Sequence, residues 1–367
     1  MIPRLRAILG SLILLSSAGP AQALEAGAIV TGPRDSTAGR FGQDIADLAR
    51  RFDIGLEVVP SQGGPDTIET LTRRSGTRLG IVPSDVLDFV SSFSEDPQLR
   101  SMAALMLVFP LYHEEVHVLA RPGIASFADL QGRRVAVGVA NSGTLLTATL
   151  LLGTAGIRPA EEVRIGGEEA LQALRDGRLD AMIDVAGQPS ALFRDKVAIE
   201  DALHLVPVDH PALTKLYPLA AIPADTYYPW QPKEVPTVAP QALLMTLRWT
   251  EPGQQEACRL VGKVARIVAD NLDRLRREGH PKWHEVDLDA KPPPGSNGER
   301  SPCVAQALAA PQGYTLATDG EASPPAGPGP QGRPGPQAGA PARACSAETN
   351  PILRRLCEVR PLLGSEP

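Results

Sequence analysis

Short apolar runs alternate with amphipathic stretches from residue 28 to about residue 207. Apolar runs of this kind are typical of strands that are buried on both faces of a parallel sheet. We expect strands at 28–31, 55–59, 79–82 and 102–108, and helices at 39–52 and 65–73. This order of strand and helix predicts a sheet covered by helices on both faces.

The same order starts again after residue 112. We expect strands at 113–120, 134–139, 163–165 and 179–185, and helices at 144–154, 168–175 and 187–194. Two successive units predict an α/β protein of two lobes joined near 109–112, each lobe a mostly parallel sheet flanked by helices. A later apolar run at 241–247 is expected to return as a strand to the first lobe.

The last third of the chain changes in composition. An amphipathic helix is predicted at 254–277, whereas 323–342 are dense in proline and glycine and cannot bury enough apolar surface to fold. The predicted organisation is a leader at 1–23, a first lobe at 24–111 and 216–290, a second lobe at 112–215, a disordered linker at 291–344 and a cysteine-bounded tail at 345–367.

The first residues have the pattern of a secretory signal peptide. Arg4 and Arg6 precede a short apolar run at 8–18, and Ala21-Gln22-Ala23 is a small-residue cleavage site. A membrane anchor is the alternative, but the run is shorter than the roughly 20 residues that cross a bilayer. We expect cleavage near Ala23 and a mature protein in the periplasm.

Charge and composition exclude some partners. The formal net charge is −6 and aromatic residues make up 4% of the chain. A nucleic-acid surface is basic, so no nucleic-acid partner is expected. The sequence also gives no sign of a cofactor, and we expect a monomer.

Four cysteines lie in the last third of the chain: Cys258, Cys303, Cys345 and Cys357. An even number in an oxidising compartment favours disulfides, and four cysteines allow three pairings. Short loops favour Cys345–Cys357 and Cys258–Cys303. Their spacing matches no zinc pattern.

The turn Asn141-Ser142-Gly143-Thr144 falls between an expected strand and an expected helix. Ser142 can cap the helix, and Gly143 lets backbone N–H groups approach a ligand. Hydroxyls beside a helix N-terminus predict a pocket for an anion. An ordinary helix cap is the alternative interpretation.

Residues 31–40 follow the first strand in the same way, with Ser36 and Thr37 as hydroxyls. Arg34 can bind a carboxylate through two parallel hydrogen bonds, and Arg40 follows it closely in the chain. Ligands of open α/β sheets lie beyond the carboxyl ends of the strands, so the turns of the two lobes would face one cleft. Pairing of Arg34 with Asp35 or with solvent is the alternative.

Two further polar turns end strands of the expected sheets. Ser84 and Asp85 follow 79–82, and Gly187-Gln188 follow 179–185. Each can also be a simple helix cap. We expect Ser84, Gly187 and Gln188 to join the ligand site.

Residues 113–117 match His-Glu-x-x-His, the zinc protease motif. That chemistry requires a helix, which places both imidazoles on one face. The flanking residues favour a strand, in which His113 and His117 would lie about 13 Å apart. We therefore expect no metal site and no enzyme here.

Several short blocks match, in order, the TAXI family of substrate-binding receptors for TRAP transporters. They are 79–86, 127–138, 141–144, 171–181, 186–189, 222–227 and 235–238. The chain resembles this family over about 28–247. The resemblance implies a type II periplasmic binding protein fold of two lobes, a small carboxylate or amino-acid ligand and a TRAP permease as membrane partner.

The departures from the family fall on the expected pocket. The family's first turn reads Ser-Thr-Gly-Gly-Thr-Tyr-Tyr; here Thr37 is retained, and Ala38 and Gly39 replace the two tyrosines. Its Gly-Ser-x-x-Asn turn appears at 63–67 without the serine and the asparagine. We therefore expect a ligand other than the family's usual one.

The predicted function is capture of a small anionic ligand by hinge closure, followed by delivery to the permease. The alternative is a periplasmic sensing subunit that reports its ligand to a signalling partner. The altered pocket and the extra tail motivate this second interpretation.

Overall fold

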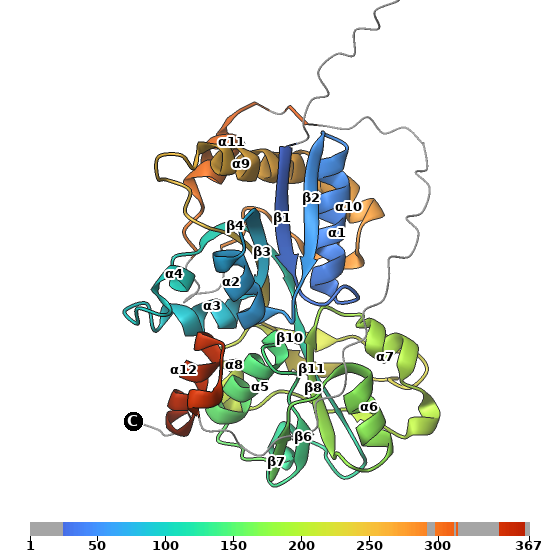
Figure 1. Ribbon diagram of the computed structural model, residues 1–367. Coiled ribbons are helices and arrows are strands. Elements are labelled where there is room, and N and C mark those ends of the chain that lie inside the picture. Colours follow the sequence, from blue (N-terminus) through green and yellow to red (C-terminus); the bar gives the residue numbers. More distant parts are fainter. Residues whose placement is uncertain (1–24, 292–297, 312, 315–344, 364–367) are drawn as a thin grey trace, which may run out of the picture.

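The computed structural model describes residues 25–291, 298–311, 313–314 and 345–363 (Figure 1). The predicted leader and most of the predicted linker lie outside the described residues. The described chain forms two α/β lobes, one above the other in Figure 1, each built on a five-stranded sheet. The predicted fold class is therefore confirmed.

Lobe 1 is built on the sheet with strand order β2-β1-β3-β12-β4. Its strands are β1 (Glu25–Thr31), β2 (Ile54–Pro60), β3 (Thr77–Pro83), β4 (Met106–His113) and β12 (Gln241–Thr246). β1 is parallel to β2 and β3, whereas β12 is antiparallel to β3 and β4. The helices that lie between these strands in sequence are α1 (Thr37–Arg50), α2 (Gly64–Arg73), α3 (Ser84–Ser91) and α4 (Arg100–Ala103).

Lobe 2 repeats this arrangement with strand order β7-β6-β8-β5-β9. Its strands are β5 (Glu115–Ala120), β6 (Arg134–Ala136), β7 (Glu161–Val163), β8 (Ala181–Ala186) and β9 (His204–Leu205). Its helices are η1 (Phe127–Leu130), α5 (Gly143–Thr154), α6 (Gly167–Arg175), α7 (Ala191–Lys196), η2 (Ile199–Asp201) and α8 (Pro211–Thr214). A two-stranded sheet of β10 (Leu219–Ile222) and β11 (Val235–Val238) follows and packs on β5. Residues 216–238, which the sequence assigned to lobe 1, therefore belong to lobe 2, because their apolar side chains pack into its core.

The chain crosses between the lobes twice, from β4 into β5 and from β11 into β12. The two crossings lie side by side, because the backbone N–H of Glu114 donates to the carbonyl of Pro240 at 2.9 Å. The strand that enters each lobe from the other lobe is β12 in lobe 1 and β5 in lobe 2. Each of these strands lies second from one edge of its sheet and runs antiparallel to its inner neighbour, β3 or β8. We call these two paired crossings the hinge.

The segment after β12 covers lobe 1 with α9 (Gln255–Asp270), α10 (Leu272–Glu278) and η3 (Pro281–Glu285). The helix predicted at 254–277 is thus two helices. The break falls at Asn271, whose side-chain amide donates to the carbonyl of Ile267 at 2.9 Å. Asparagine competes for backbone hydrogen bonds in this way and favours helix ends.

The predicted linker is wrong at 302–309, because α11 (Pro302–Ala309) is a helix packed on α9. Cys303 and Val304 are buried there, and the Cys258–Cys303 disulfide joins the two helices. The second predicted disulfide, Cys345–Cys357, is also present. It lies in the C-terminal part, which forms η4 (Cys345–Ala347), α12 (Pro351–Val359) and η5 (Arg360–Leu362).

Candidate functional site

The His-Glu-x-x-His segment is extended, as predicted: His113 ends β4 and His117 lies in β5. The His117 ring is buried, with Nδ1 2.8 Å from the carbonyl of Glu115 and Nε2 2.7 Å from the hydroxyl of Tyr227. Burial lowers the pKa of this imidazole to about 4. His117 therefore acts as a neutral packing residue that holds Tyr227 in lobe 2.

The start of α1 in lobe 1 contacts the end of β8 in lobe 2. The hydroxyl of Thr37 donates to the carbonyl of Gly187 at 3.1 Å, and Thr37 is buried. A Cβ atom at Gly187 would lie 2.9 Å from the Thr37 methyl and 3.0 Å from the Tyr112 ring, so only glycine fits at this contact. Two of the predicted site residues therefore meet directly across the interface between the lobes.

The starts of α2 and α5 form a second contact between the lobes. A Cβ atom at Gly64 would lie only 2.7 Å from the Cα of Gly143, so the two backbones touch. Gly64 also has a φ of +45°, which favours glycine. Beside it, the N–H of Asp66 faces the carbonyl of Asn141 at 3.4 Å. The turn at 63–67, which lacks the serine and the asparagine of the TAXI family, is thus the place where the backbones of the two lobes come into contact.

The start of α3 makes the third contact. The hydroxyl of Ser84 accepts from the N–H of Gln241 at 3.1 Å, beside the hinge. The Asp85 carboxylate accepts from the hydroxyls of Thr147 at 2.7 Å and Tyr217 at 3.4 Å, both outside lobe 1. Burial raises the pKa of Asp85 to about 6, against the effect of these hydrogen bonds. The sequence suggested Asp85 only as a helix cap.

The other predicted hydroxyls serve their own lobes. Ser36 caps α1 by accepting from the N–H of Gly39, and Ser142 caps α5 by accepting from the N–H of Leu145. The hydroxyl of Thr144 accepts from the N–H of Val185 at 3.3 Å, within lobe 2. For Ser36 and Ser142, helix capping is what the geometry shows.

The two predicted arginines lie at the surface. Arg34 and Arg40 are exposed, and within the described part of the chain neither guanidinium group makes a hydrogen bond or an ion pair. The structure therefore brings Thr37, Ser84, Asn141, Gly143 and Gly187 to the lobe interface, but not the guanidinium groups.

An ion-pair network that the sequence did not suggest lies at the hinge. The Lys282 ammonium, in η3, is 2.5 Å from both Glu115 and Glu285, and its side chain is only 2% exposed. Glu115 also accepts from the N–H of Gln188 at 2.9 Å. Burial raises the pKa of Glu115, although Lys282 opposes this. Because Lys282 belongs to lobe 1 and Gln188 to lobe 2, the network joins both lobes through the first residue of β5.

Glu285 completes this network on the lobe 1 side. It accepts from the backbone N–H of His113 at 3.1 Å. Burial alone would raise the pKa of Glu285, but its hydrogen bonds with His113 and Lys282 lower it to about 2. The carboxylate is therefore charged throughout the neutral range.

Carboxyl groups dominate the electrostatics between the lobes. Burial and the nearby Asp85 raise the pKa of Glu114 to about 8, and its carboxyl group accepts a hydrogen bond from the Tyr112 hydroxyl at 3.3 Å. Burial and Asp35 raise the pKa of Asp184 to about 6. Carboxyl groups accept hydrogen bonds from ammonium groups, and backbone N–H groups at helix starts bind carboxylates.

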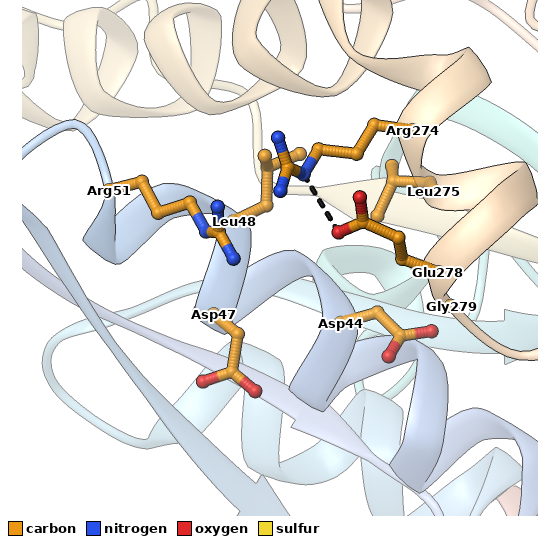
Figure 2. Close-up of a pocket in the computed structure, with 8 residues that line it drawn as sticks. All are labelled: Asp44, Asp47, Leu48, Arg51, Arg274, Leu275, Glu278 and Gly279. Carbon is orange, nitrogen blue, oxygen red and sulfur yellow. Dashed lines mark hydrogen bonds and ion pairs between the residues drawn. The ribbon is translucent and has the colours of Figure 1, made fainter. Parts of the chain in front are cut away.

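A surface pocket lies elsewhere, between α1 and α10 of lobe 1 (Figure 2). It is lined by Asp44, Asp47, Leu48, Arg51, Arg274, Leu275, Glu278 and Gly279. Figure 2 shows Arg274 turned to Glu278, which it contacts at 2.8 Å. This pocket does not touch lobe 2, so it is not the candidate ligand site.

A protein-family model, the NMT1-like family, matches residues 31–290, which span both lobes. Among solved structures, the periplasmic binding protein BugD covers 78% of this chain and 93% of its own, at 12% identity and a TM-score of 0.45. An ancestral arginine-binding protein bound to arginine covers 72% and 96%, at 14% identity and a TM-score of 0.42. The alkanesulfonate-binding protein SsuA from Xanthomonas axonopodis pv. citri covers 77% and 83%, at 16% identity and a TM-score of 0.40. Likenesses this weak carry nothing over to the ligand of this chain.

Proposed function

The chain belongs to the NMT1-like family, and from this premise we propose that it is an extracytoplasmic solute-binding receptor that closes on a small ligand. One observation carries the proposal. Helix starts of lobe 1 meet polar groups of lobe 2 at a single interface beside a two-stranded hinge, as in the contacts Thr37–Gly187 and Asp85–Thr147. A binding protein needs this arrangement, because its ligand must stabilise the closed state more than the open one.

The ligand class follows from the groups at this interface. Helix starts offer backbone N–H groups for a carboxylate, and Glu114 and Asp85 offer carboxyl oxygens for an ammonium group. We infer a small carboxylate, with an amino acid as the form that uses both kinds of group. The exposed Arg34 and Arg40 are available to the ligand only if they turn into the interface.

Secretion to the periplasm and delivery to a TRAP-type permease complete the proposal. They rest on the leader pattern at 1–23 and on the resemblance to the TAXI receptors. No helix among the described residues combines the length and the hydropathy that a bilayer crossing requires. A TRAP permease gene beside the gene for this chain would support delivery, whereas a sensor kinase gene there would favour the sensing alternative.

The ligand proposal is tested by thermal unfolding of protein freed of bound ligand by unfolding and refolding. We expect an amino acid or small carboxylate at 100 times its Kd to stabilise the fold by about 2.7 kcal/mol. Thr37→Val should reduce this gain. The matched control is Thr72→Val, which removes a hydroxyl that bonds only to carbonyls of its own helix. Failure of every compound of both classes to stabilise the protein would count against the proposal.

A further inference from the structure

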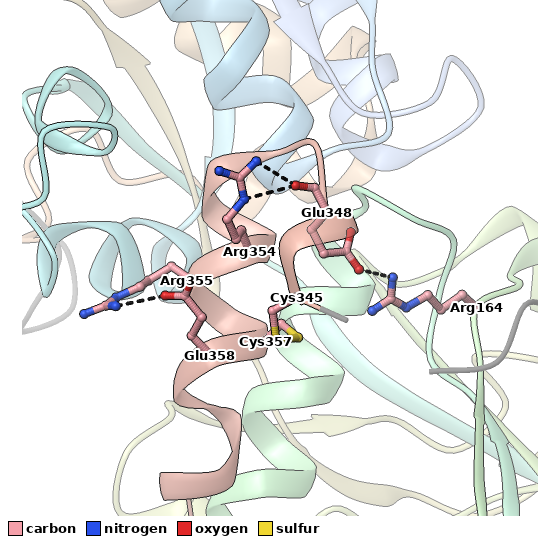
Figure 3. Close-up of a disulfide and its surroundings, with 7 residues drawn as sticks. All are labelled: Arg164, Cys345, Glu348, Arg354, Arg355, Cys357 and Glu358. Carbon is pink, nitrogen blue, oxygen red and sulfur yellow. Dashed lines mark hydrogen bonds and ion pairs between the residues drawn. A yellow bond between two sulfur atoms is a disulfide. The ribbon is translucent and has the colours of Figure 1, made fainter. Parts of the chain in front are cut away.

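The C-terminal residues 345–363 lie against both lobes, at the boundary between them (Figure 1). This segment contains η4, α12 and η5, and the Cys345–Cys357 disulfide ties the start of the segment to the end of α12 (Figure 3). We call it the clasp. The disulfide cross-links residues 345 and 357, so η4 is covalently tied to α12.

The clasp is attached to lobe 2 by charge and by packing. Glu348 pairs with Arg164, as Figure 3 shows, and Arg360 pairs with Glu162 beside it. Leu363 packs on Gly153 of α5, where a Cβ atom would lie 2.7 Å from the leucine Cβ. These contacts hold both ends of the clasp to one lobe.

The clasp contacts lobe 1 at α2 and at the end of α3. The Asn350 side chain, which is 1% exposed, donates to the Glu69 carboxylate at 2.8 Å and faces the Pro65 carbonyl at 3.4 Å. The guanidinium of Arg355 lies 4.5 Å from the ring centre of Phe93, just after α3. Pro65 is next to Gly64, so the clasp contacts lobe 1 directly beside the candidate ligand site.

Apolar packing joins the two sets of contacts. Ile352, Leu353 and Leu356 form the buried face of α12. They belong to one core cluster with Ile68 of α2 and Leu152 of α5. The apolar face of the clasp therefore packs into a core that both lobes share.

We propose that the clasp fastens the lobes in the closed state and must release lobe 1 before the lobes can open. Hinge opening moves α2 away from α5, and a clasp held by lobe 2 would then lose Glu69 and Phe93. Its contacts are made only in the closed state, so they favour that state and slow the escape of a ligand. The effect on ligand escape rests on the proposed receptor function, but the fastening of the lobes does not.

The test uses the full chain without ligand and the variant Asn350→Asp. The Asn350 side chain caps α12 by accepting from the N–H groups of Ile352 and Leu353, and aspartate caps equally well. The substitution removes the amide donor that faces Glu69 and the Pro65 carbonyl, and it brings two carboxylates together. We expect a larger radius of gyration in X-ray scattering and about tenfold faster amide hydrogen exchange in α12 and the first turn of α2.

The double variant Asn350→Asp with Glu69→Gln restores an amide–carboxylate pair with donor and acceptor exchanged, so it should return both measurements toward the wild type. Ser346→Asp is the control, because it adds a carboxylate to the clasp at an exposed position away from the contacts with lobe 1. An unchanged radius of gyration and unchanged exchange in Asn350→Asp would overturn the proposal. So would an effect that the double variant does not reverse, since the change would then come from damage to the clasp itself.

The ligand hypothesis can fail independently of this test. Its failure would appear as a missing thermal stabilisation by amino acids and carboxylates. The scattering and exchange measurements need no ligand, so their outcome decides the role of the clasp alone.

Discussion

The carboxylate of Asp85 in lobe 1 accepts a hydrogen bond of 2.7 Å from the hydroxyl of Thr147 in lobe 2. Thr147 is fully buried and Asp85 nearly so. Asp85 lies in the first turn of α3 and Thr147 lies in α5, and these two helices contact each other across the interface. This bond reports directly on whether the lobes are closed.

The variant Thr147→Val should raise the pKa of Asp85 further above 6, because Thr147 is the strongest of the groups that lower it. The lost bond should cost about 1.5–3 kcal/mol of unfolding free energy at pH 8, where Asp85 is charged, and less at pH 5. Urea unfolding at both pH values measures this. Thr149→Val is the control, since that buried hydroxyl bonds only to Leu145 in its own helix. Equal losses at the two pH values would contradict the prediction.

The variant Glu114→Gln should change how stability depends on pH. Burial raises the folded-state pKa of Glu114 from 4.5 to about 8, so between these values the folded state binds more protons than the unfolded state. Glu114 therefore makes stability fall as pH rises through this window. Removing the charge should raise the unfolding free energy at pH 8 by on the order of 1 kcal/mol and have little effect at pH 4.5.

The measurement for Glu114→Gln is chemical unfolding from pH 4.5 to 8, taken as the difference from the wild type. Taking this difference cancels the contributions of His117 and His280, whose lowered pKa values act in the opposite direction. Glu256→Gln on α9 is the exposed control. If the difference in unfolding free energy between variant and wild type does not grow with pH, the pKa of Glu114 is the same in the folded and the unfolded chain.

The variant Lys282→Met should destabilise the protein by about 3–5 kcal/mol, because it leaves the buried Glu115 without its counter-charge. Adding Glu115→Gln to the same molecule should recover part of this loss, since no buried charge then remains unpaired. Lys215→Met provides the exposed control. Unfolding free energies of the wild type, Lys282→Met, Glu115→Gln and the double variant give the coupling, and strictly additive effects would argue against a hinge ion pair.

The variant Gly64→Ala should keep the lobes apart, because its Cβ would lie 2.7 Å from the Gly143 backbone. Gly76→Ala is a matched control: Gly76 also has a positive φ, of +81°, but a Cβ there meets nothing within 4 Å. Both variants carry backbone strain of about 1–2 kcal/mol. X-ray scattering should show an expanded molecule for Gly64→Ala only, and equal radii would mean that this contact does not limit closure.

The sequence by itself determined the local elements and the class of fold. The apolar run at 79–82 predicted β3, and helical spacing at 39–52 predicted α1, because buried faces leave a periodic pattern of apolar residues. The strand predicted at 102–108 was wrong at its start, where 100–103 form α4 and β4 begins at Met106. Both disulfides could be predicted as well, because short loops close at the lowest cost in chain entropy. The polar turns at 36–37 and 141–144 were visible because helix starts select such residues.

The partners of those turns were decided only by the tertiary structure. Glu115 and Lys282 are 167 positions apart, and Asn350 and Glu69 are 281 apart, so no local pattern links them. Helix α11 was hidden for the same reason, since its stability comes from packing on α9 rather than from its own short sequence. Periodicity tells which face of an element is buried, but not what lies against it, and only the folded arrangement of the two lobes fixes which carboxylates and amides meet.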